Sequence, residues 1–147
     1  MPPHPAAVIP HRLLIAAGPF DGLAPEQVAA PIVRGLRSGG AEEPDVLTLD
    51  PGVPVLELLD AGGFDRRMRA ARAVVVALAR LDETTLTSTP AFEIATRARQ
   101  GGVPAYAITA ANGLGAFDAR ILDLQLILQA RDPRALAAAG RRLAAVA

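Results

Sequence analysis

Five short runs of apolar residues divide the chain, and their length and composition are typical of buried strands. The runs are Leu13–Ala17, Asp45–Leu49, Ala73–Leu78, Val103–Thr109 and Leu124–Ala130. The third run shows no alternation with polar residues, which is typical of a strand covered on both faces. We therefore expect this run to lie at the centre of a sheet.

Helix signals separate these runs. The expected helices begin at Pro25, Pro90 and Pro133, with two shorter ones over Phe64–Ala71 and Ala116–Asp123. Each of the three longer helices starts with proline at its first position, where the missing N–H costs nothing. Glycine pairs at 39–40 and 101–102 end the first two.

Strands that alternate with helices and are joined by right-handed crossovers define the fold class. They predict a three-layer, doubly wound α/β domain around a mostly parallel sheet of about five strands, Rossmann-like or flavodoxin-like. We expect residues 12–147 to form this single domain after a flexible leader, 1–11, because a chain of 147 residues fits one core. The stretch 53–69 is less regular, and its role stays open.

Composition removes several kinds of chemistry. Apolar residues make up 51% of the chain and charged residues 20%, so a sizeable core is expected and disorder is not. All fifteen basic residues are arginines, which excludes Schiff bases, P-loop phosphate binding and the lysine that receiver domains use. Cysteine is absent too. Both histidines, His4 and His11, lie in the leader, so proton chemistry in the body of the chain depends on Asp and Glu.

Charge and hydropathy also bear on location and partners. Fifteen acids balance fifteen bases, and nothing in their distribution indicates a nucleic-acid surface or a basic membrane patch. The chain shows neither a secretory signal pattern nor an apolar run long enough to span a bilayer. We expect a cytoplasmic protein.

Three polar or glycine-rich loops follow strands, at the edge where open sheets bind ligands. They are Gly18–Gly22, Arg80–Thr85 and Asn112–Gly115. The second loop places a cation, a carboxylate and two hydroxyls together, although a surface pair of Arg80 with Asp82 and a helix cap at Thr89 would explain the same residues. The first loop lacks the G-x-G-x-x-G spacing of dinucleotide sites, and the third is a weak signal.

The residues around these loops resemble a known family. The segment 14–36, with its strand, its loop and its helix start Pro-Glu-Gln-Val-Ala, resembles the opening of bacterial glycerate kinases, which read D-S-F-K-G and then E-x-V-A-x-x-I-x-x-G-L. The segment 74–90 resembles the family's later V-I-T-G-E-G-R-L-D-x-Q-T motif, where Arg80, Leu81, Asp82 and Thr85 fit directly. The resemblance covers about residues 13–147 and implies an enzyme lobe without the second lobe that family members insert near 53–69.

The resemblance implies site residues and cofactors. Asp82 would be the catalytic base or a magnesium ligand, and Asp21 a weaker magnesium ligand, with ATP as the phosphoryl donor. The implied substrate- or phosphate-binding residues are Arg80, Thr84, Thr85, Phe20, Gly22, Asn112 and Gly113. The implied ligand is a small hydroxy acid such as glycerate, or a nucleotide.

Departures from the family pattern favour a degenerate relative. Gly18 and Pro19 replace the aspartate and serine of D-S-F-K-G, and Asp21 replaces its lysine. A carboxylate in place of a cation opposes phosphate binding by several kcal/mol at an effective dielectric of about 20. We therefore expect a non-catalytic small-anion, nucleotide or protein-binding module, with an active phosphotransferase as the alternative and a flavodoxin-like electron carrier as a more distant one.

A homodimer is also expected. Loss of the inserted lobe would uncover apolar residues at Val53, Val55, Leu58 and Leu59, which a second copy could cover. The alternative is that this stretch folds back over its own sheet.

Overall fold

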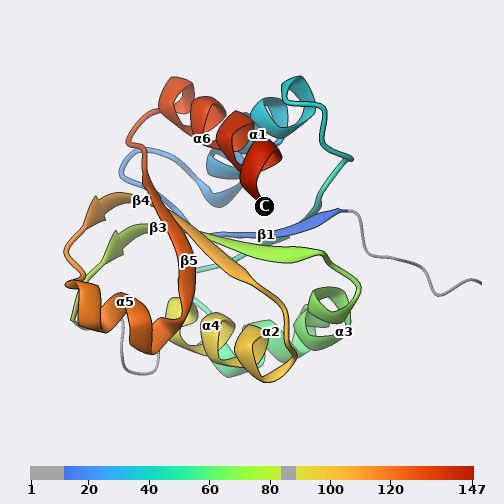
Figure 1. Cartoon of the computed structure of the whole chain (residues 1–147). Helices are drawn as coiled ribbons and strands as arrows, with labels where there is room; N and C mark the ends of the chain where they lie inside the picture. The colour runs from blue at the N-terminus through green and yellow to red at the C-terminus, as the bar shows by residue number, and fades with distance from the viewer. Residues whose placement is uncertain (1–11, 84–88) are drawn as a thin grey trace, which may run out of the picture.

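A five-stranded parallel sheet forms the middle layer of the computed structural model, which describes residues 12–83 and 89–147 (Figure 1). The strands are β1 (Leu13–Ala17), β2 (Asp45–Thr48), β3 (Ala73–Leu81), β4 (Ala105–Asn112) and β5 (Leu124–Gln129). Their order across the sheet is β2-β1-β3-β4-β5, and every neighbouring pair is parallel. This is the doubly wound α/β fold that the alternation of strands and helices predicts.

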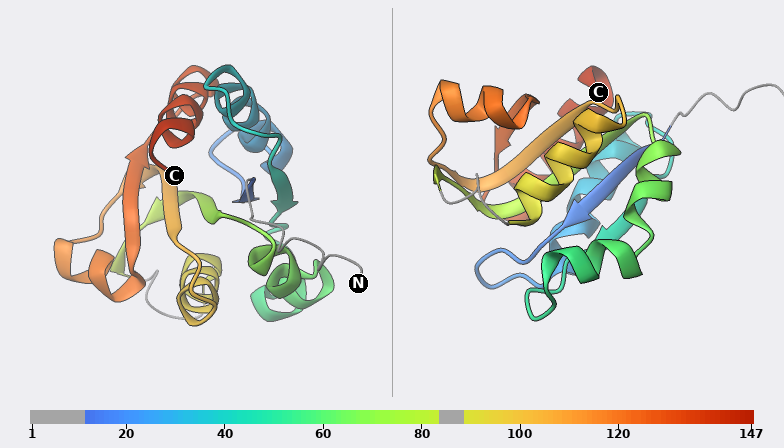
Figure 2. Two further views of the ribbon diagram at one scale, coloured as in Figure 1. Left: turned by 45° about the vertical axis from the view of Figure 1, so that its right-hand side comes forward. Right: turned by 90° about the horizontal axis from the view of Figure 1, so that it is seen from below.

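Helices cover both faces of the sheet. They are α1 (Pro25–Ser38), α2 (Val55–Ala61), α3 (Phe64–Arg69), α4 (Pro90–Gln100), α5 (Ala116–Leu122) and α6 (Pro133–Val146). Helices α1 and α6 lie on one face, and α2, α3, α4 and α5 lie on the other (Figure 2). Because side chains alternate along a strand, β1 contributes side chains to the core on both faces of the sheet. Leu13 and Ile15 pack toward α1 and α6, whereas Leu14 packs toward the opposite helices.

Helices α1 and α6 meet almost backbone to backbone. A Cβ atom added to Gly35 would overlap the carbonyl oxygen of Ala137 and would lie 2.8 Å from its carbonyl carbon. A Cβ added to Gly140 would overlap the carbonyl oxygen of Ile32 and would lie 3.0 Å from the Leu36 nitrogen. Glycine is therefore required at both positions for the close approach of the two helices.

Arginine side chains tie the opposite layer together. Arg67 of α3 donates to Asp45 at the start of β2 at 2.7 and 2.9 Å, and to the carbonyl oxygen of Val46 at 2.8 Å. The hydrogen bonds from Arg67 lower the pKa of the Asp45 carboxyl. Arg97 of α4 reaches Asp60 of α2 at 3.3 Å and Asp65 of α3 at 3.1 Å. One side chain on α4 thus contacts both short helices.

The structure corrects two element boundaries. Strands β3 and β4 run on together beyond the apolar runs, with Arg80 beside Ala111 and Leu81 beside Asn112. Arg80 therefore belongs to β3 and Asn112 to β4, whereas the sequence predicts loops for both. The strands can continue because each supplies the other with backbone hydrogen bonds even where their side chains become polar or exposed.

The irregular stretch 53–69 forms two short helices, α2 and α3. The sequence predicts α3 but not α2. Leu59 of α2 is fully buried, and Val55 and Leu58 pack against the same core cluster. The stretch therefore folds back over its own sheet, which was the alternative to an uncovered surface. The homodimer itself stays a prediction.

The leader, 1–11, lies outside the described residues. None of the helices in the described ranges is both long enough and apolar enough to span a membrane. The cytoplasmic location stays a prediction.

Candidate functional site

The chain changes direction across the sheet between β1 and β3. Helix α1 follows β1 on one face and leads to β2, whereas α4 follows β3 on the other face and leads to β4 (Figure 1). The two connections diverge at the carboxyl ends of the strands and leave a crevice there. Open α/β sheets bind their ligands at such a switch point.

Unequal strand lengths deepen this crevice. The pairing of β1 with β3 ends at Ala17 and Ala77, where the N–H of Gly18 donates to the carbonyl oxygen of Ala77 at 2.8 Å. Strand β3 continues to Leu81 beside β4 only. The flank of β3 that faces β1 is therefore left to the loop Gly18–Gly22, and two cavities lie along it.

The first cavity, here called the switch-point cavity, has a volume of about 570 Å³. It lies on the α2 and α4 side of the sheet. Most of its lining is apolar, with charged groups confined to Asp50, Arg80 and Asp82. The lining residues are Gly18, Pro19, Leu49, Asp50, Pro51, Val53, Val55, Leu58, Leu59, Leu78, Ala79, Arg80, Asp82, Thr89 and Pro90.

Asp50 and Gly18 shape this cavity. One carboxylate oxygen of Asp50 accepts from the N–H of Gly52 at 2.8 Å, so this side chain organises the turn that leads into α2. A Cβ at Gly18 would lie 2.9 Å from Cδ2 of Leu78. The absence of a side chain at position 18 therefore leaves room for Leu78 in the cavity wall.

The second cavity, here called the arginine cavity, has a volume of about 610 Å³ and a more polar lining. Its residues are Phe20, Asp21, Ala79, Arg80, Ala110, Ala111 and Arg131. Arg131 donates from Nε to the carbonyl oxygen of Ala110 at 3.2 Å, which holds its side chain beside β4. Two arginines face a single carboxylate, that of Asp21.

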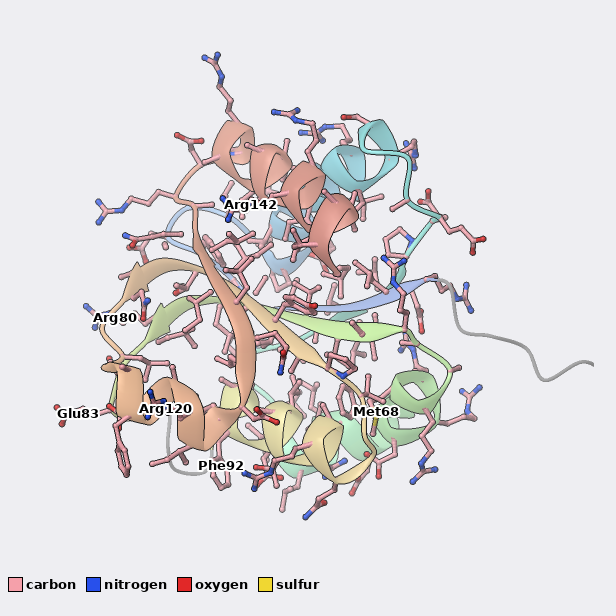
Figure 3. All side chains as sticks on the ribbon, in the orientation of Figure 1. Met68, Arg80, Glu83, Phe92, Arg120 and Arg142 are labelled. Atoms are coloured by element: carbon pink, nitrogen blue, oxygen red, sulfur yellow. The ribbon has the colours of Figure 1, made fainter. Side chains whose placement is uncertain are left out.

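The structure brings some of the predicted site residues together. Arg80 and Asp82 line the switch-point cavity, and Arg80 also joins Phe20 and Asp21 in the arginine cavity. Figure 3 shows Arg80 near the carboxyl ends of β3 and β4, on the opposite side of the molecule from Met68. Thr84 and Thr85 lie outside the described residues, so the structure does not place them.

Three other predicted binding residues shape turns and line neither cavity. Gly22 adopts a φ of +75° in the turn between Phe20 and Leu23, a conformation that favours glycine. The side chain of Asn112 accepts from the N–H of Leu114 at 3.1 Å. The N–H of Gly113 donates to the carbonyl oxygen of Leu81 at 2.6 Å. Their local roles are structural, and binding by them stays untested.

Sequence reasoning missed Arg131 and the apolar wall of the switch-point cavity. Arg131 follows β5 closely, so the rule that selected the other three loops would also have selected it. Leu49, Val53 and Leu58 carry no such signal, because apolar residues in those positions are usual for any core.

The carboxylates of the described residues do not gather into a metal site. In the described ranges, no three side chains of His, Cys, Asp or Glu lie close enough together to hold one ion. Asp21 and Asp82, the predicted magnesium ligands, line different cavities. Binding of ATP and magnesium remains untested.

Comparison with known proteins supports the fold and overturns the family resemblance. No protein-family model matches the chain, and no curated protein matches it. A solved structure, that of a response regulator receiver domain from Rhodospirillum rubrum, is similar over 90% of both chains with a TM-score of 0.53 and 17% sequence identity. This likeness shows a flavodoxin-like α/β fold, in agreement with the predicted class.

The prediction of a glycerate-kinase relative is therefore wrong. The two functions predicted from it are wrong as well: a degenerate glycerate-kinase-like module for small anions, nucleotides or proteins, and its alternative, an active phosphotransferase. The structural neighbour is a domain of matching extent, so the fold does not require an inserted second lobe. The physical reason is that the shared motifs consist of an apolar strand, a Gly-Pro turn and a proline-started helix. Doubly wound sheets in general use these devices, so the motifs follow from the fold.

Proposed function

We propose that this chain is a non-enzymatic signalling module whose input is the binding of a small, largely apolar molecule in the switch-point cavity. The observation that carries the proposal is the cavity itself. Its volume of about 570 Å³ lies within the range of roughly 300–1,000 Å³ that is typical of small-molecule sites. Its lining is mainly apolar with a few charged groups at one end, which is also typical of such sites.

The name of the structural neighbour supports a role in signalling, because a response regulator receiver domain is a signalling domain. The input that we propose is ligand binding, because the cavity has the volume and the apolar lining of a small-molecule site.

Titration calorimetry with 1-octanol, a neutral apolar probe, tests this proposal. A ligand of nine non-hydrogen atoms that gains about 0.5 kcal/mol per atom has a dissociation constant of about 0.5 mM. The substitution Val53→Trp places an indole in the cavity, because the half-buried Val53 side chain lines it. We expect this variant to bind 1-octanol at least about tenfold more weakly, since the occupied volume is lost.

Val146→Trp is the matched control. Val146 is 49% exposed at the end of α6 and lines neither cavity. The affinity of the Val146→Trp variant for 1-octanol should equal that of the parent protein. Equal binding by the parent and Val53→Trp, or no binding by the parent, would contradict the proposal.

A further inference from the structure

The two cavities meet at one short segment of β3. Ala79 and Arg80 line both of them, and the flank of β3 that they occupy is not paired with β1 because β1 ends opposite Ala77. The switch-point cavity lies toward α2 and α4, and the arginine cavity lies toward Phe20 and the end of β4. A ligand that passed over the carboxyl edge of the sheet at this segment would contact both cavities.

The cavities differ in chemistry across this segment. Apolar side chains such as Leu49, Leu58 and Leu78 dominate the wall of the switch-point cavity. The charged groups of the arginine cavity are Arg80, Arg131 and Asp21, so its formal charge is positive by one unit. The switch-point cavity suits the apolar part of a ligand, and the arginine cavity suits an anionic group on the same ligand.

Arg80 is placed to hold that anionic group. Within residues 12–83 and 89–147, the Arg80 side chain forms no hydrogen bond or ion pair with another residue, including Asp82. The guanidinium of Arg131 is anchored through Nε to Ala110 on the other side of the same cavity. Guanidinium groups bind carboxylates and phosphates through paired hydrogen bonds, so two arginines that line one cavity favour an anion there.

We propose that the ligand of this module is an amphipathic anion, with its apolar body in the switch-point cavity and its carboxylate or phosphate head group between Arg80 and Arg131. This inference rests on the proposed function and adds the class of ligand. The carboxylate of Asp21 repels an anionic head group and so lowers the affinity of the cavity for the ligand. Both head groups share the chemistry that the arginines recognise, so the probes below separate them.

Calorimetric titration with 1-octanol, octanoate, octyl phosphate and octylamine tests the inference, since these probes share one alkyl chain. We expect octanoate, octyl phosphate or both to bind about five- to tenfold more tightly than 1-octanol, and octylamine to bind more weakly than 1-octanol. The tighter of the two anions identifies the head group. Raising the salt concentration to about 0.5 M should reduce the preference because the charges are exposed.

Variants then locate the head group. Arg80→Gln should remove most of the preference for the anion over 1-octanol, and Arg131→Gln should reduce it. Asp21→Asn should strengthen binding of the anion by about twofold, because a repulsive charge is lost. Arg120→Gln is the matched control: Arg120 is exposed on α5 and lines neither cavity (Figure 3), so the preference should not change.

Failure of this inference is distinguishable from failure of the proposed function. Equal binding of octanoate, octyl phosphate and 1-octanol, all weakened by Val53→Trp, would overturn the anionic head group and leave the apolar site in place. A preference for the anion that survives Arg80→Gln would also overturn it. Absence of binding by all four probes would overturn both.

Discussion

The two faces of the sheet are built in different ways. On one face, two 14-residue helices, α1 and α6, approach so closely that only glycine fits at positions 35 and 140. On the other face, α2 and α3 have seven and six residues, and arginine side chains connect them to the rest of the protein. No described residue of α1 or α6 lines either cavity, whereas α2 and α4 both border the switch-point cavity.

Stability and binding therefore depend on different faces of the sheet. Close backbone packing leaves no volume for a ligand, so the α1 and α6 face serves as the rigid support. Short helices joined by polar side chains open at lower free energy, and binding sites are commonly drawn from such regions. We therefore expect changes on the first face to alter global stability and changes on the second to act locally.

The largest expected effect comes from Gly35→Ala. The new methyl group would overlap the backbone of Ala137, and the helices would have to separate. We expect the free energy of unfolding to fall by about 3 kcal/mol or more, at the upper end of the usual cost of overpacking. Urea denaturation of both proteins measures this change.

Gly115→Ala is the control for this substitution. Gly115 has a φ of −74°, and the nearest atom to an added Cβ is a carboxylate oxygen of Asp118 at 4.0 Å. We expect a change of less than about 1 kcal/mol. Equal effects of the two substitutions would contradict the close backbone contact between α1 and α6 at Gly35.

A smaller effect is expected from Asp45→Asn. This change removes the charge that Arg67 binds at 2.7 Å, and we expect a loss of about 1–2 kcal/mol at pH 7, as for hydrogen bonds to charged groups. The matched control is Glu43→Gln at the exposed pair with Arg37, where we expect no measurable change.

The effect of Asp45→Asn should depend on pH. Arg67 lowers the pKa of Asp45 in the folded protein, so the stabilisation is fully present above the unfolded pKa of about 3.9. It is lost as the pH falls through the lower, folded value. Urea denaturation of both proteins between pH 7 and pH 3 should show their stabilities converge toward acid. A difference that grows toward acid would contradict this sign.

Arg97→Gln should produce a local effect. Arg97 is only 17% exposed and pairs with Asp60 and Asp65, and its loss should cost about 0.5–1 kcal/mol. Hydrogen exchange should become faster in α2 and α3, with α1 and α6 unchanged. A uniform increase across all helices would contradict the division between the two faces.

The smallest expected effect concerns self-association. The predicted homodimer depends on the α2 region, where Leu59 is buried in its own core and Leu56 is 55% exposed. Light scattering should give twice the 15.2 kDa chain mass at high micromolar concentration, and Leu56→Glu should give the monomer mass. A monomer at every concentration would overturn the homodimer and leave the ligand site unaffected.

Much of the fold could be predicted from the sequence, because buried strands are continuous apolar runs. The third run, Ala73–Leu78, lies at the centre of the sheet as expected. Its strand continues through the exposed Arg80 to the buried Leu81, which hydropathy cannot show, because pairing with β4 sustains the strand across a charged residue. Helix α2 was missed because its leucines do not mark a single apolar face: Leu59 is buried, whereas Leu56 is 55% exposed.

The candidate site was less predictable. Arg80, Asp82, Phe20 and Asp21 were selected because they follow the predicted apolar runs, in loops that the glycerate-kinase resemblance also marked, and each lines a cavity. The apolar wall comes from segments far apart in the sequence, and no local pattern distinguishes Leu58 at a cavity from a leucine in a filled core. Family motifs misled for a related reason, since short strand-turn-helix patterns specify an architecture that many functions share.

Amide chemical-shift mapping during a titration with 1-octanol tests directly whether the switch-point cavity is the binding site. We expect the largest shifts at the cavity residues Gly18, Leu58 and Leu78, with the amides of α1 and α6 little changed. The competing apolar surface is Phe117 on α5, which is 73% exposed. Shifts centred there or on α6, with no shift at the cavity amides, would show that 1-octanol does not bind in the switch-point cavity.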